Sequence, residues 1–162
     1  MSLRQRGFTL IEIMVVLVIL GVFTTLVLIY VGRAADQRIS SASNEVKHWL
    51  EQVHSSAMLQ GALLGVRIDG PNLRVVRYQQ YQWYVAQFAP YVLPEHFRFE
   101  WPTEIREQLA ADTTENSLPS LVFYPSGILE PEGEVSVTGD GLTVKVQWDG
   151  TGKIQLIHGA KP

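Results

Sequence analysis

One stretch near the N-terminus constrains this 162-residue chain more than any other: an apolar run from Ile13 to Val31 without a charged residue. A helix needs about 20 apolar residues to cross a bilayer, so this run is long enough to span one. Arg4 and Arg6 precede it, and positive charge on that flank predicts a cytoplasmic N-terminus with the rest of the chain outside. Because no proline occurs before Pro71, the helix can continue beyond the membrane.

A single ionisable residue, Glu12, lies at the start of this apolar segment. A charged group in a membrane segment is costly and usually needs a partner, which makes Glu12 a candidate functional residue. Two plainer alternatives remain open. The segment can be an ordinary signal anchor with Glu12 in the membrane interface. It can also be a cleaved secretory signal ending near Ala34-Ala35, although the apolar core of such signals is shorter, about 7–15 residues.

The sequence GFTLIE at residues 7–12 resembles the class III signal of type IV pilins and of the pseudopilins of type II secretion systems. In that family a short basic leader ends in Gly, and Phe, Thr, Leu, a further aliphatic residue and Glu follow before the apolar helix. The resemblance implies that a prepilin peptidase cuts between Gly7 and Phe8 and methylates the new amine of Phe8. It also implies that Glu12 contacts the N-terminal amine of a neighbouring subunit during assembly. A carboxylate and an ammonium attract strongly at low dielectric and are costly unpaired, so this contact would select the register of neighbouring helices.

The chain contains no cysteine, which excludes disulfides and Cys-ligated metal sites. After Arg33 it carries 10 Lys and Arg against 15 Asp and Glu. A nucleic-acid-binding domain normally shows a basic face, so nucleic acid is not an expected partner. The nearby residues Arg67, Arg74 and Arg77 leave a local basic contact surface open.

Apolar residues spaced by three and four predict that the helix continues, as an amphipathic helix, to a stop at Gly61. The predicted buried stripe consists of Ile39, Ala42, Val46, Trp49, Leu50, Val53 and Ala57. Beyond Gly61 the apolar period changes to two, which is typical of strands. Strands are predicted at 64–69, 73–78, 81–88, 96–101, 120–124, 134–138, 142–148 and 153–158. Residues 90–94 are predicted as a loop, and 102–119 as a surface excursion with a short helix at 104–111.

The predicted fold class is therefore α+β. A long N-terminal helix, transmembrane in its first half, packs on a globular head of two antiparallel β-sheets that resembles a β-sandwich. The predicted parts are a cleaved leader at 1–7, the transmembrane and assembly half of the helix at 8–31, its amphipathic half at 32–61, and a β-rich periplasmic head at 62–162.

The last third of the chain carries a second resemblance. The sequences FYPSG at 123–127, VKV at 144–146 and DGTGKI at 149–154 are similar to the GspH/FimT family of minor pseudopilins and minor pilins. GVRI at 65–68 and Trp83 also fit that family's pattern. The absence of a C-terminal cysteine pair argues against a major type IV pilin.

These resemblances imply a structural subunit at or near the tip of a type II secretion pseudopilus. The implied partners are other minor and major pseudopilins, the prepilin peptidase, the inner membrane and the secretion platform in it, with secreted proteins as a further candidate. The implied location is the bacterial inner membrane, crossed once, with the head in the periplasm. A minor pilin that primes a type IV pilus for adhesion, twitching or DNA uptake is the alternative.

No motif for catalysis, metal or cofactor binding is evident, so no enzyme activity and no cofactor are predicted. His48 and His54 are six residues apart and do not share a helix face, and His96 and His158 are isolated. The acidic cluster Glu130, Glu132 and Glu134 matches no calcium loop and is predicted to be a solvated turn. An anchored periplasmic enzyme is the third alternative.

Aromatic side chains crowd into the segment 78–91, and they are Tyr78, Tyr81, Trp83, Tyr84, Phe88 and Tyr91. Some of them are expected in the core. An exposed subset would form a protein-docking patch, because Tyr and Trp dominate interface hot spots.

Overall fold

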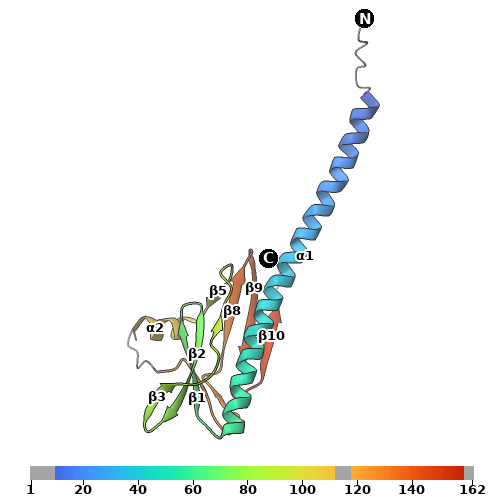
Figure 1. The fold of residues 1–162 in the computed structure, drawn as a ribbon. Coiled ribbons are helices and arrows are strands. Elements are labelled where there is room, and N and C mark those ends of the chain that lie inside the picture. The colour runs from blue at the N-terminus through green and yellow to red at the C-terminus, as the bar shows by residue number, and fades with distance from the viewer. Residues whose placement is uncertain (1–9, 112–117, 159–162) are drawn as a thin grey trace, which may run out of the picture. The chain divides into compact units, whose positions relative to one another are not determined.

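The structure is a computed structural model that describes residues 10–111 and 118–158, without the side chains of 25–33, 108–111 and 158 (Figure 1). The predicted leader at 1–7 lies outside the described residues. The chain divides into two compact units, residues 1–37 and 38–162. Helix α1 (Leu10–Gln60) contributes to both, and all the strands belong to the second.

The head half of α1 confirms the predicted stripe. Each of its seven apolar residues is buried, with exposed fractions from 0 to 7%. The helix ends where the sequence predicts, because Gly61 takes the left-handed conformation with φ +58°. The Ala62 amide donates to the Ala57 carbonyl and the Gly61 amide to the Met58 carbonyl, which caps the last helical carbonyls.

The first sheet contains six strands, and its main path runs in the order β3-β2-β1-β6-β7, with β4 also paired to β2. All of its pairings are antiparallel. The strands are β1 (Leu64–Asp69), β2 (Asn72–Gln79), β3 (Gln82–Val85), β4 (Tyr91–Val92), β6 (Leu121–Phe123) and β7 (Leu129–Glu130). The β1–β2 hairpin was predicted, whereas the pairing of β1 with β6 joins segments that are distant in sequence.

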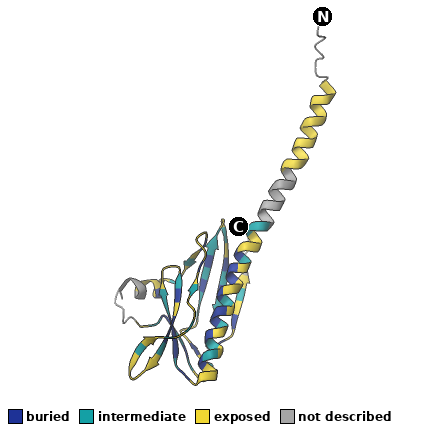
Figure 2. Cartoon of the chain, in the orientation of Figure 1, coloured by how far each residue is buried: buried dark blue, intermediate teal, exposed yellow. Residues whose placement is uncertain are grey.

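The second sheet has the order β10-β9-β8-β5 and is also antiparallel. Its strands are β5 (Arg98–Glu100), β8 (Gly133–Gly139), β9 (Leu142–Trp148) and β10 (Ile154–His158). The apolar residues of one face of each sheet join the α1 stripe in a single core cluster (Figures 1 and 2). The predicted α+β fold class is confirmed.

Several predicted boundaries were wrong. The third strand is β3 alone, since Tyr81 lies in the turn before it and residues 86–88 leave the ladder. The predicted loop at 90–94 contains β4, and the fourth strand shortens to β5. The short helix predicted at 104–111, by contrast, is confirmed: the excursion after Trp101 begins with α2 (Thr103–Ala111), which buries Ile105. Residues 112–117 lie outside the described residues.

Tyr91 of β4 packs against helix α1 and forms a hydrogen bond with it. Its ring centroid lies 6.3 Å from that of Trp49, and its hydroxyl donates to the Ala42 carbonyl at 3.4 Å. Burial, with a further contribution from Glu45, raises the pKa of Tyr91 from 10.0 to about 12. Because the folded state holds this proton more tightly than the unfolded state, the linkage lowers stability as pH rises from 10.0 to about 12.

Tyr91→Phe is therefore expected to flatten the alkaline loss of stability, since the variant has no phenol to titrate at this site. The measurement compares urea unfolding midpoints of wild type and variant at about pH 9 and about pH 11. An equal decrease of the midpoint in both proteins would contradict the prediction.

Candidate functional site

Of the predicted assembly site, the structure describes Glu12, in the first turn of α1. Arg4, Arg6, Gly7 and Phe8 lie outside the described residues. Glu12 lies in the first turn, where a carboxylate interacts favourably with the helix dipole. Its side chain is exposed, so it is accessible to a group from a neighbouring chain.

Apart from Glu12, the surface of α1 from Leu10 to Phe23 is apolar on every side. All its large hydrophobic residues are exposed, from 47% at Val16 to 79% at Leu10 (Figure 2). Thr24 donates its hydroxyl to the Leu20 carbonyl at 2.8 Å, which satisfies this polar group within the helix. A helix that is apolar all round needs lipid or other helices around it.

Within the described residues, no helix is both long and apolar enough to cross a membrane. The predicted span at 8–31 falls partly outside the described residues and side chains.

In the head, His54 of α1 joins the two turns that carry the second resemblance. Its Nε2 donates to the Gly127 carbonyl at 2.8 Å, and its ring centroid lies 6.1 Å from that of Phe123. Gly152 is buried beside the ring with φ +77°, and a Cβ there would collide with His54 and lie 2.6 Å from the Gly127 oxygen. The sequence pattern suggested no role for His54 except as a candidate metal ligand, and its packing role depends on tertiary contacts that no local pattern shows.

Each residue of the acidic cluster has a structural partner. Glu130 accepts from the Tyr124 hydroxyl at 3.1 Å, and that hydrogen bond raises the pKa of Tyr124. Glu132 accepts from the Gly150 amide at 3.0 Å, and Glu134 pairs with Lys145 at 2.6 Å. The three carboxylates therefore shape turns and strand pairs. Among the described residues no group of three or more potential ligands is placed to hold a metal ion.

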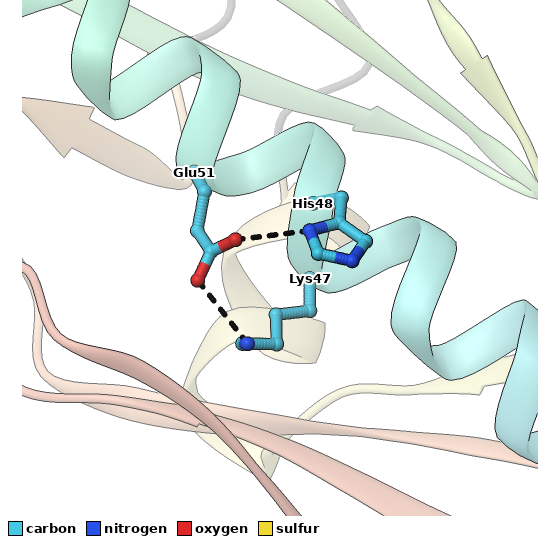
Figure 3. Close-up of polar contacts among 3 residues, drawn as sticks. All are labelled: Lys47, His48 and Glu51. Atoms are coloured by element: carbon cyan, nitrogen blue, oxygen red, sulfur yellow. Dashed lines mark hydrogen bonds and ion pairs between the residues drawn. The ribbon is translucent and has the colours of Figure 1, made fainter.

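The exposed side of α1 carries a small polar network. The carboxylate of Glu51 lies 3.3 Å from Lys47 Nζ through Oε1 and 3.1 Å from His48 Nδ1 through Oε2 (Figure 3). An exposed ion pair with the i,i+4 spacing of Lys47 and Glu51 contributes about 0.3–0.5 kcal/mol. The network borders an open depression of about 490 Å³, lined by His48, Glu51, Gln52, Ser55, Ser56 and Phe88.

The three arginines do not form one basic patch. Arg67 and Arg74 lie directly opposite each other on neighbouring strands, whereas Arg77 is three residues further along β2 and so projects from the other face of the sheet. Arg74 also lies 3.8 Å from the Asp69 carboxylate. The three arginines therefore do not share one face of the sheet.

The aromatic segment divides between packing and exposure. Phe88 and Tyr91 contact Trp49 of α1, and Trp83 contacts Tyr78 at a ring distance of 5.2 Å. The exposed members are Tyr78 at 38%, Tyr84 at 45% and Tyr81 at 92%. As expected from the sequence, some of these aromatic side chains pack against the core and others are exposed.

Comparisons with known proteins agree with these features. The family model of the prokaryotic N-terminal methylation motif matches residues 2–28. The type II secretion system protein H of Aeromonas hydrophila is 25% identical over 143 residues, which cover 79% of this chain and 78% of that protein.

Two solved structures share the fold. The minor pseudopilin EpsH from the type 2 secretion system of Vibrio cholerae superposes with a TM-score of 0.58 and 18% identity, over 74% of this chain and 95% of that one. The type IV minor pilin FimU of Pseudomonas aeruginosa gives a TM-score of 0.56 and 15% identity, over 75% and 89%. At these identities the likeness establishes a helix packed on antiparallel sheets.

Proposed function

We propose that this chain, a pilin-like protein with an N-terminal methylation motif, is the minor pseudopilin H of a type II secretion system. The observation that carries the proposal is the similarity to a type II secretion system protein H across 79% of the chain. In this role the protein is a structural subunit and not an enzyme.

The proposed pathway begins with insertion into the inner membrane, the N-terminus remaining in the cytoplasm because of Arg4 and Arg6. The peptidase removes residues 1–7 and methylates Phe8. Residues 8–31 then form the membrane and assembly half of the helix, 32–61 its amphipathic half, and 62–162 the periplasmic head. The apolar exposed surface of α1 supports this use, since neighbouring helices would replace lipid around it.

In the growing fibre, Glu12 pairs with the methylated amine of a neighbouring subunit. The helices pack into a short pseudopilus, and the head lies at or near its tip. At the tip the head contacts other minor pseudopilins, and secreted proteins are its further proposed partners.

A minor pilin of a type IV pilus is the second candidate, because the FimU structure matches this fold almost as well as EpsH does. Both functions use the same anchor, so the test must separate secretion from piliation.

The test is a clean deletion of the gene with two readouts, the periplasmic retention of normally secreted enzymes and the presence of surface pili with twitching. We expect secreted enzymes to accumulate in the periplasm while twitching persists, and the wild-type gene supplied in trans to restore secretion. Loss of pili and twitching with normal secretion would assign the protein to the type IV pilus instead.

A further inference from the structure

The end of the β2–β3 hairpin, residues 78–85, forms an arm at the margin of the first sheet (Figure 1). The β1–β2 ladder ends at Arg77, and beyond it β2 continues paired to β3 alone, through Tyr78↔Trp83 and Gln79↔Gln82. The other edge of β3 has no strand beside it among the described residues, so its backbone groups can accept a further strand.

The turn of the arm has a left-handed backbone at two residues whose side chains disfavour that conformation. Gln80 and Tyr81 both have positive φ, 48° and 64°. The β8–β9 hairpin has a turn of the same length and handedness, but there the residues are Asp140 and Gly141, which suit this geometry. A tyrosine is disfavoured in the left-handed region, because its Cβ comes too close to the following carbonyl oxygen. The head thus holds Tyr81 at the tip at a cost in stability, and the side chain is 92% exposed.

The arm also lacks the charges that normally protect an edge strand. No Asp, Glu, Lys or Arg occurs between Arg77 and Glu95, although 18% of the whole chain is charged. Two other margins differ: β5 carries Arg98 and Glu100, and β4 lies between Pro90 and Pro94. The edge strand β10 (Ile154–His158) is also uncharged, but it has neither the crowded aromatic residues nor an exposed tyrosine at a turn. Depletion of charge together with enrichment of aromatic residues characterises the centre of protein–protein interfaces.

We propose that the arm docks onto the head of a different pilin-like subunit, with an extended, uncharged strand of that subunit pairing to the free edge of β3. The unpaired edge selects an extended backbone as its occupant, and the uncharged surface selects an apolar or neutral polar partner. Tyr81 serves as the anchor, because exposed tyrosines lose little conformational entropy when they bind and often dominate the affinity.

The identity of the occupant rests on the proposed function. Subunits of a fibre whose α1 helices run parallel are related by a screw rotation, so each contact joins two unlike surfaces. A minor subunit has unlike neighbours. The arm therefore meets the head of another subunit, and not the arm of a second copy.

The natural absence of cysteine allows a direct test in the full-length chain in its own cells. Val85→Cys, on β3 and 69% exposed in wild type, is labelled with a benzophenone maleimide and illuminated, and the adduct is identified by mass spectrometry. Gln155→Cys, at an exposed position on the edge strand β10 of the second sheet, provides the matched control. We expect Val85→Cys to capture a different protein that carries its own N-terminal methylation motif, with little capture from Gln155→Cys.

A second variant separates docking from folding. Gln80→Asn with Tyr81→Gly installs turn residues that suit the observed backbone, so the melting temperature is expected to stay level or rise. Without the tyrosine anchor, the adduct from Val85→Cys is expected to decrease about tenfold. Capture of a second copy of this chain, of a protein without the motif, or an unchanged yield from the turn variant would each overturn the proposal.

The phenotype of the gene deletion tests the proposed function independently of the crosslinking experiment. If the deletion abolishes pili while the captured protein carries the motif, the secretion assignment fails and the docking arm stands. If secretion fails as proposed and Val85→Cys captures no motif-bearing protein, the docking arm alone is wrong.

Discussion

Glu12→Ala is expected to be inserted and cleaved normally, yet to be recovered in assembled fibres at no more than about a tenth of the wild-type amount. The variant removes the carboxylate that we propose pairs with a neighbour's methylated amine. An ammonium left unpaired at low dielectric costs several kcal/mol, and each 1.4 kcal/mol corresponds to about a tenfold change in an equilibrium. The measurement is the ratio of the cleaved protein in sheared fibres to that in membranes.

Asp36→Ala is the matched control, because it removes an exposed carboxylate elsewhere on the same helix. This control is expected to enter fibres at the wild-type ratio. Glu12→Gln keeps the size of the side chain without its charge and should fail as Glu12→Ala does. Wild-type recovery of Glu12→Ala would refute the proposed pairing.

Gly152→Ala is expected to destabilise the head by about 2–4 kcal/mol, the largest effect on stability among the variants described here. Two costs combine at this position. The backbone is left-handed, with φ +77°, and a Cβ would collide with the His54 ring that holds the Gly127 carbonyl. The measurement is urea unfolding of residues 38–162, the compact unit that contains the whole described core.

Gly141→Ala separates the two costs. Gly141 has nearly the same φ, +75°, but nothing lies within 4 Å of its added Cβ, so we expect a loss of only about 1 kcal/mol. The double variant His54→Ala with Gly152→Ala should be less destabilised than the sum of its single variants, because both act on one contact. Equal losses for Gly141→Ala and Gly152→Ala would show that the collision with His54 has no effect.

Much of the fold was predictable because its signals are local. The α1 stripe repeats with the helical period, and a left-handed glycine ends the helix at the predicted position. The β8–β9 hairpin follows from alternating residues around Asp140 and Gly141. The strands β4 and β7 were missed because each has two residues, too few to show a period, and each exists through pairing with a longer neighbour.

The candidate sites divide in the same way. The assembly segment could be proposed from sequence because its residues are contiguous, at 7–12, and precede an apolar helix. Of the predicted site residues, Glu12 alone lies within the described range, and its role in assembly stays a prediction. The roles of His54 and of the acidic cluster depend on contacts between segments distant in sequence. No local pattern encodes such contacts.

The sequence by itself determined the apolar N-terminal segment, the amphipathic helix and the change to a β-rich head, because periodicity and turn chemistry act over a few residues. Only the tertiary structure decided which strands meet, and so which side chains share a surface. Strand pairing placed Arg67 beside Arg74 but Arg77 on the other face. It also left β3 at the edge of its sheet among the described strands, with Tyr81 exposed in the turn before it. These outcomes depend on the packing of the whole head, where the burial of one face of a strand determines what the other face presents to solvent.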